Sequence, residues 1–146
     1  MRRGALPASL AALALCGCGS SSLSSTQLRQ DATRICATAS ERTDRIATPT
    51  SPAGSGQFLA QGVAALGPEL KALAALRPPS DVARVYATAL SAASAELSAL
   101  RATARQLDVG ADPVSGISSL QRRLGPIESR ANAAWHSLAI PACVNR

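Results

Sequence analysis

The sequence predicts an all-α protein that folds as an antiparallel four-helix bundle with one disulfide. Of the 146 residues, 31 are alanine and only three are aromatic; alanine favours helices, whereas strands are rich in β-branched and aromatic residues. Apolar residues recur at steps of three and four in four segments, which is the spacing of one helical face. Short stretches rich in proline or glycine separate the segments, and short connections favour antiparallel neighbours.

The N-terminal stretch predicts a segment that is not part of the fold. Arg2 and Arg3 give a positive start. The apolar run 5–15 that follows is too short to cross a bilayer, which needs about 20 residues. The stretch Leu15-Cys16-Gly17-Cys18, followed by serines, resembles the lipobox of bacterial lipoproteins. In that motif a leucine and a small residue precede the cysteine that receives a diacylglyceryl group.

This resemblance implies that Cys18 is the lipidated residue. Cleavage before Cys18 places Gly17 in the small pocket of the signal peptidase, whereas cleavage before Cys16 would place bulky Leu15 there. A diacylated cysteine is sufficient for stable anchoring, so the expected location is the extracytoplasmic face of the cell membrane. The alternative is an ordinary secreted protein that is cleaved nearby. The expected domains are a signal peptide (1–17), a lipidated and serine-rich tether (18–25) and a helical bundle (26–146).

The first predicted helix begins at Ser24 or Ser25. Ser24 and Gln27 have the spacing of a capping box. Two prolines and two glycines within residues 48–56 end the helix. Its apolar face carries Leu28, Ala32, Ile35, Ala39 and Ile46, with Cys36 at the flank.

The second predicted helix spans about residues 57–76, and its apolar face carries Leu59, Val63, Leu66, Leu70 and Leu73. Gly67-Pro68 interrupts it and predicts a kink or a one-residue break, because proline removes one backbone hydrogen bond. The third helix is expected to be capped by Ser80. Its seam is the longest and carries Tyr86, Leu90, Ala93, Leu97, Leu100, Ala104 and Leu107.

The fourth predicted helix begins at Asp112-Pro113, an N-cap followed by proline at the first helical position. Gly125-Pro126 predicts a second kink. The tail leaves the helix at Pro141 and is expected to fold back toward the first helix. The seam carries Ile117, Leu120, Leu124, Ile127, Ala131, Ala134 and Leu138, with Trp135 beside it.

Cys36 and Cys143 remain as thiols once the signal is removed and Cys18 is acylated. Two cysteines in an exported protein indicate a disulfide, here one that closes a loop of about 100 residues. A redox pair usually shows the Cys-x-x-Cys spacing and a metal site needs further ligands, and the sequence shows neither. It therefore predicts a structural disulfide, with no metal and no cofactor.

The layout of the two cysteines is similar to that of small helical lipoproteins of high-GC bacteria. The similarity rests on Arg34-Ile35-Cys36-Ala37 and on the alanine-rich segment 133–143, which ends in Cys143. It covers a general pattern without a specific motif, and it implies no particular activity.

Reactive residues are sparse. His136 is the only histidine, its nearest acid in sequence is Glu128, and the nine acids never recur as a paired-carboxylate motif. We therefore expect the protein not to be an enzyme. Without the signal, 13 basic and 9 acidic residues leave a mild charge of +4. With no basic cluster, nucleic acid is not an expected partner. Arg122, Arg123 and Arg130 predict either a face toward anionic lipid or a solvated face.

The expected function is that of a non-enzymatic binding or scaffold module tethered to the cell envelope. Its expected partners are membrane lipid, through acylated Cys18, and an envelope protein. The alternative is a small-ligand carrier or sensor with a cavity inside the bundle, where Trp135 and Tyr86 could line an apolar pocket.

Overall fold

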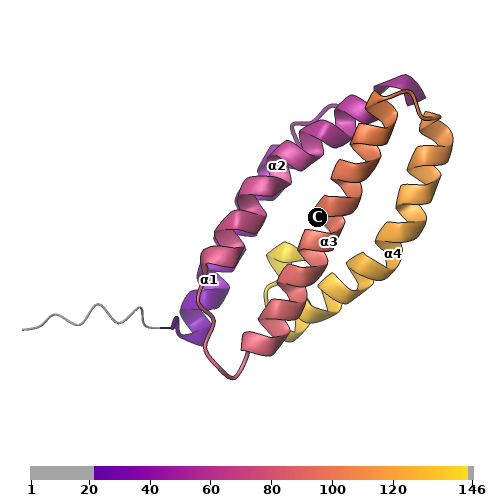
Figure 1. Ribbon diagram of the computed structural model, residues 1–146. Helices are drawn as coiled ribbons and strands as arrows, with labels where there is room; N and C mark the ends of the chain where they lie inside the picture. The colour runs from indigo at the N-terminus through magenta and orange to yellow at the C-terminus, as the bar shows by residue number, and fades with distance from the viewer. Residues whose placement is uncertain (1–21, 145–146) are drawn as a thin grey trace, which may run out of the picture.

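A computed structural model of the chain describes residues 22–144. The predicted signal peptide and the predicted lipidation site Cys18 lie outside the described residues. Four antiparallel α-helices and two short 3-10 turns make up this part of the chain, in which no strand occurs (Figure 1). The all-α class and the four-helix bundle are therefore confirmed. The elements are α1 (Ser25–Thr43), η1 (Pro52–Gly54), α2 (Ser55–Ala75), α3 (Ala83–Asp108), α4 (Pro113–Ser137) and η2 (Pro141–Cys143).

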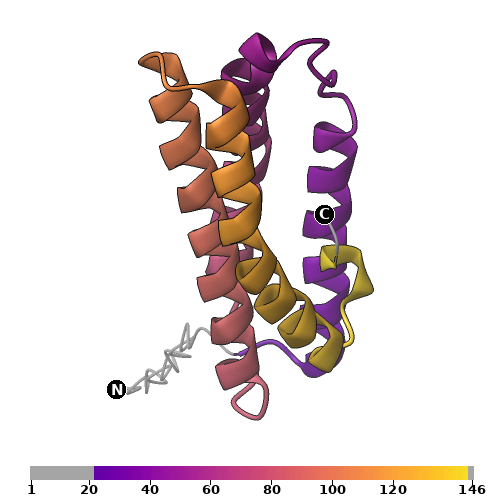
Figure 2. The same ribbon diagram turned by 90° about the vertical axis from the view of Figure 1, so that its right-hand side faces the viewer.

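The helices do not form a symmetric square. α3 packs between α2 and α4, and α1 packs against α2. Within residues 22–144, α1 and α4 are not in direct helix-to-helix contact; the C-terminal turn η2 lies between them and packs against both (Figure 2). The tail of the chain thus closes the fourth side of the bundle.

Two of the three predicted caps are present. The Ser24 hydroxyl accepts a hydrogen bond from the Gln27 N–H at 3.2 Å, and the Gln27 side chain accepts one from the Ser24 N–H at 2.9 Å. This reciprocal pair satisfies two backbone donors that the first turn of a helix leaves free. Asp112 accepts from the Ser115 N–H at 2.8 Å, so α4 begins where predicted.

The predicted Ser80 cap is wrong. α3 begins only at Ala83, and Val82 precedes it without a side-chain capping bond. The Val82 N–H instead donates to the Pro79 carbonyl at 3.2 Å. This bond closes a separate turn over residues 79–82, so the helix begins after that turn and not at Ser80.

Neither Gly-Pro pair breaks its helix. α2 continues through Pro68 and α4 through Pro126. The prediction was a kink or a one-residue break, and the break is absent from both helices. The α4 ribbon does change direction partway along its length (Figures 1 and 2). α1 ends earlier than the apolar pattern predicts, at Thr43, so Ile46 falls in the turn that follows it.

The chain reverses sharply after α4. The Ala139 N–H donates to the His136 carbonyl and the Ile140 N–H to the Trp135 carbonyl, both at 3.0 Å. These are the two bonds of a Schellman motif, whose left-handed position is held here by Ala139 with φ 56°. The reversal directs Ile140 into the core, where it is fully buried.

Buried apolar side chains form two separate clusters. The larger lies at the end where residue 23 joins the bundle, since the Leu23 N–H donates to the Arg77 carbonyl at 2.8 Å. We call this half of the molecule the entry half, and the half that contains η1 and the α3–α4 turn the far half. The entry cluster is Leu28, Ala32, Cys36, Leu73, Tyr86, Ala89, Ala92, Ala131, Ala134, Trp135, Leu138, Ile140 and Cys143. The far cluster is Leu59, Ala99 and Leu120, with Leu100, Ala104, Leu107, Ile117 and Leu124 against it.

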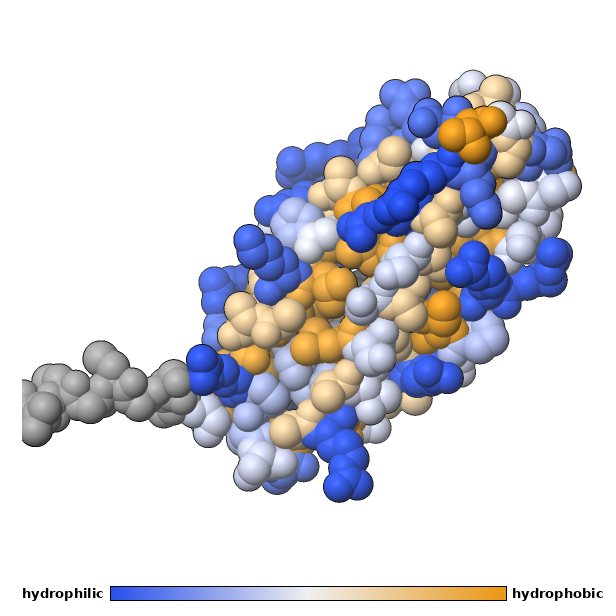
Figure 3. All heavy atoms as spheres, in the orientation of Figure 1, coloured by the Kyte–Doolittle hydropathy of each residue, from blue (hydrophilic) through white to orange (hydrophobic). Residues whose placement is uncertain are grey.

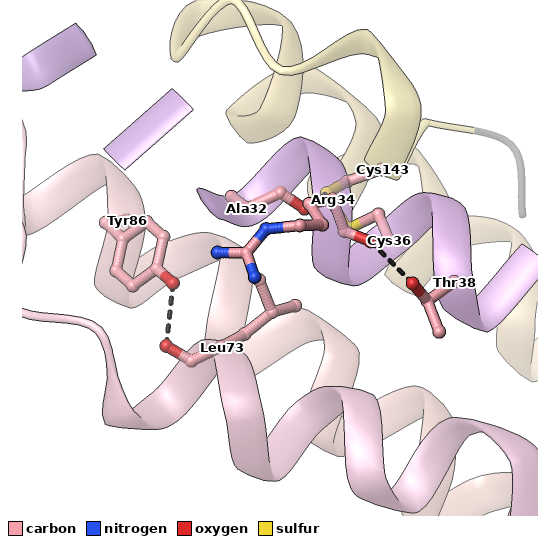
Figure 4. The surroundings of a disulfide bond; sticks show 7 residues. All are labelled: Ala32, Arg34, Cys36, Thr38, Leu73, Tyr86 and Cys143. Carbon is pink, nitrogen blue, oxygen red and sulfur yellow. Dashed lines mark hydrogen bonds between the residues drawn. A yellow bond between two sulfur atoms is a disulfide. The ribbon is translucent and has the colours of Figure 1, made fainter. Parts of the chain in front are cut away.

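Cys36 and Cys143 form the predicted disulfide. Their Cα atoms are 5.2 Å apart, which is ordinary for such a bond. Both residues are buried in the entry cluster, where η2 lies against α1 (Figure 4). The bond ties the C-terminal tail to the middle of α1, as the position of Pro141 in the sequence predicts.

Candidate functional site

The residues that the sequence singled out do not converge on one site. Cys36 and Cys143 are bonded to each other and buried. His136 is exposed in the last turn of α4. Arg122, Arg123 and Arg130 are likewise exposed along α4. None of these side chains is held against another in a reactive arrangement.

The two large rings pack on each other. Tyr86 and Trp135 are at most 1% exposed, and their ring centroids are 5.9 Å apart in an edge-to-face arrangement. The Tyr86 hydroxyl donates to the Leu73 carbonyl at 2.7 Å, which fastens the end of α2 to the start of α3 (Figure 4). Burial raises the pKa of this phenol. The rings therefore occupy the interior at this level, as core aromatics do.

A pair of glutamates, by contrast, lies at a void between α2 and α3, one of them buried and the other partly exposed. Glu69 on α2 is only 3% exposed. Glu69 and Glu96 of α3 line the same small void between the two helices, which measures about 10 Å³. The remaining walls of the void are apolar: Leu66, Leu70, Ala93 and Leu97. We call Glu69 and Glu96 the glutamate layer.

The surroundings of Glu96 favour its protonated form. Burial, and after it the negative charge of Glu128 on α4, together raise the pKa of the Glu96 carboxyl to about 7. Desolvation and a like charge both disfavour an ionised carboxylate. Glu96 is therefore an acid whose pKa is shifted into the neutral range.

This layer was not predicted, because no paired-carboxylate motif marks it in the sequence. Glu69 and Glu96 are 27 residues apart in the sequence, and only the packing of α2 on α3 brings them together. A signal was nevertheless present. Glu69 follows Leu66 by three residues and precedes Leu73 by four, so it falls on the apolar face of its helix. A charge on such a face predicts a buried polar position.

An open groove of about 580 Å³ lies in the far half of the molecule. It runs between η1, the start of α2, the end of α3 and the start of α4. Its walls are small side chains, and Gln57, Arg105 and Asp108 supply the polar groups. We call it the far groove, and its lining is Ala53, Gly56, Gln57, Ala60, Ala104, Arg105, Leu107, Asp108 and Pro113.

Exposed apolar side chains flank the far groove in sequence. Val109 is 84% exposed and Val114 61% exposed, and each directly follows a lining residue. Figure 3 shows apolar surface at this end of the molecule among hydrophilic residues. An open groove with apolar walls, polar groups of both signs and exposed apolar neighbours has the features of a binding surface.

A second groove, of about 340 Å³, separates α1 from α2. Arg34, Thr38 and Arg42 line it from α1, and Glu69 lines it from α2. Arg34 also pairs with Asp31 one turn earlier on α1. The buried Glu69 thus lies between two arginines on one side and Glu96 on the other.

Within residues 22–144, no three histidine, cysteine or acidic side chains are grouped so as to hold a metal ion. Over the same residues, none of the helices combines the length and the apolar character that crossing a membrane requires.

Comparison with known proteins identifies no relative of this chain. No family model, no curated protein and no solved structure matches it. The chain is thus a small all-helical protein with four helices and one disulfide, and its function has to be argued from its own residues.

Proposed function

We propose that this protein is a lipoprotein, anchored through acylated Cys18 to the extracytoplasmic face of the cell membrane, that binds an envelope protein through its far groove. It acts as a binding or scaffold module and not as an enzyme. The observation that carries the binding part of the proposal is the far groove itself. The lipobox-like stretch that ends in Cys18 carries the anchoring part.

The disulfide supports a location outside the cytoplasm. Structural disulfides persist in oxidising compartments and are rare in the reducing cytosol. The Cys36–Cys143 bond is buried and closes a sequence separation of 107 residues. Export by the N-terminal signal and oxidation after export are consistent with each other.

The position of the groove suits an anchored protein. Residue 23 joins the bundle at the α2–α3 loop, since the Leu23 N–H donates to the Arg77 carbonyl. Residue 23 is only five positions after Cys18 in the sequence, so the anchor is close to the entry half along the chain. The entry half would therefore face the membrane, and the far groove would face away from it, toward other proteins of the envelope.

Replacing Cys18 by serine tests the anchor. Serine has no thiol to accept the diacylglyceryl group, so we expect Cys18→Ser to lose incorporation of labelled palmitate and to leave the membrane fraction. Cys16→Ser is the matched control and is expected to keep both properties, because residue 16 is removed with the signal. Label in the Cys18→Ser protein, or loss of label in the Cys16→Ser protein, would contradict the assignment.

Obstructing the far groove tests the binding function. Ala60 is an exposed residue of α2 that lines the groove, and Ala64, one turn further along α2, is also exposed but does not line it. We expect Ala60→Arg to abolish a protein crosslink formed in the native membrane and Ala64→Arg to retain it. A crosslink that survives Ala60→Arg would place the partner elsewhere, and far-ultraviolet circular dichroism checks that both variants fold.

The alternative proposal is a carrier or sensor for a small ligand. The far groove is within the size range of small-molecule sites, whereas the void at the glutamate layer, at about 10 Å³, is barely the size of one water probe. Native mass spectrometry distinguishes the two proposals. A co-purified small molecule that is lost in Ala60→Arg would favour the carrier.

A further inference from the structure

The glutamate layer lies between the two halves of the core. On α2, Glu69 falls between Leu59 of the far cluster and Leu73 of the entry cluster. On α3, Glu96 falls between Ala92 of the entry cluster and Ala99 of the far cluster. The two carboxyl groups therefore lie at the level between the two apolar clusters, where they share a void with Leu66, Leu70, Ala93 and Leu97.

The two halves are not equally well secured. The entry cluster draws buried side chains from all four helices and η2, and it contains the disulfide. Within residues 22–144, the buried members of the far cluster come from α2, α3 and α4 only. Regions with fewer buried apolar contacts open at lower free energy. The far half is therefore the part expected to open first.

Both helices packed against α3 bring an acid to Glu96. α2 contributes Glu69, which lines the same void, and α4 contributes Glu128, whose charge acts on Glu96. The arginines of this region, Arg34 and Arg42, lie on α1, which packs on α2. They share the α1–α2 groove with Glu69, on the side of Glu69 that is away from Glu96. Glu96 is only partly exposed, and the void beside it is too small to hydrate an ion. A negative charge on Glu96 therefore loses part of its hydration and faces an acid on each of the two helices packed against α3.

We propose that the glutamate layer is a pH-sensitive joint: while Glu96 is protonated the far half stays packed on the entry half, and ionisation of Glu96 loosens the far half alone. The disulfide keeps the entry half together in both states. Because the far groove is built from the far halves of α2, α3 and α4, the joint would also control the shape of the groove. The joint depends on Glu69, Glu96 and Glu128 and does not depend on the membrane anchor.

The direction of the pH dependence follows from the environment of Glu96. Burial raises the pKa of its carboxyl above the ordinary value of 4.5, to about 7. The folded state thus binds the proton more tightly than the unfolded state, so this group's contribution to stability is fully present below pH 4.5 and is lost as the pH rises through 7. The joint is expected to be closed at pH 5 and loosened at pH 8.

Amide hydrogen exchange of the purified protein at pH 5 and pH 8, corrected for the intrinsic exchange rates, tests the joint. We expect protection in residues 57–66 and 98–107 to fall by at least about tenfold at pH 8, since each unit of the pKa shift from 4.5 to about 7 corresponds to a factor of ten. Protection in residues 28–36 and 86–92 of the entry half is expected to change much less. A change of equal size in both halves, or no change in either, would overturn the proposal.

A neutral isostere identifies the responsible group. Glu96→Gln keeps the shape of the protonated side chain but cannot ionise, so we expect it to hold the far half protected at both pH values. Glu41→Gln, at an exposed position of α1, is the matched control and should retain the wild-type pH dependence. If the far half of Glu96→Gln still loosens at pH 8, Glu96 is not the sensor. Far-ultraviolet circular dichroism confirms that each variant is folded before exchange begins.

Discussion

Replacing Cys36 and Cys143 together by alanine is expected to lower the free energy of unfolding by about 4 kcal/mol. The bond closes a sequence separation of 107 residues, and the chain-entropy estimate for a loop of about 100 residues is near 4.7 kcal/mol. Total stabilities of small domains are about 5–15 kcal/mol. The variant would therefore lose a large part of its stability.

The loss is expected to concentrate at α1. This helix packs on α2 and on η2, but not directly on α4, and the disulfide is the covalent link between α1 and η2. Without the link the tail is held only by buried side chains such as Ile140. We therefore expect hydrogen-exchange protection to fall more in α1 than in the central helix α3.

Urea unfolding with and without reductant measures the effect. The wild-type protein should lose stability when reductant is added, because its bond is then broken, whereas the double-alanine variant should unfold at the same urea concentration in both conditions. The variant thus serves as the control for effects of the reductant itself. A wild-type protein that stays equally stable after its thiols are shown to be free would contradict the prediction.

The apolar spacing, the capping box at Ser24 and the Asp112-Pro113 start predicted the helices well, because these signals act within a few residues of each other. The disulfide was also predictable, since the expected mature chain offers only one pair of thiols. The helix signals depend on local sequence, and the disulfide follows from the number of thiols. Predicting them does not require knowing which helix packs on which.

What the sequence could not predict depends on contacts between distant segments. The start of α3 moved from Ser80 to Ala83 because a turn bond to Pro79 forms first. The glutamate layer exists only because α2 packs on α3 at the level of Glu69 and Glu96. The far groove likewise forms only because η1 lies close to the start of α2, the end of α3 and the start of α4. Helical periodicity shows which residues share a face of a helix, but it does not show which other helix packs against that face.

The second large effect is expected at Trp135. Its indole is fully buried in the entry cluster and packs edge to face on Tyr86 at 5.9 Å. Replacing a buried tryptophan by alanine removes this contact and leaves a cavity, which typically costs about 3–5 kcal/mol. We expect Trp135→Ala to approach the limit of stability, and the disulfide is expected to keep its unfolded chain compact enough for reversible refolding.

Trp135→Phe is the matched control, because it keeps an aromatic ring against Tyr86 while removing the indole N–H. That N–H is buried and makes no hydrogen bond within the part of the chain that the structure describes, so its removal relieves the cost of burying an unpaired donor. We expect Trp135→Phe to lose less than about 2 kcal/mol in urea unfolding. Equal losses for phenylalanine and alanine would mean that the indole N–H contributes to stability, against the burial seen here. The difference between the two variants therefore measures how much of the entry cluster depends on ring packing.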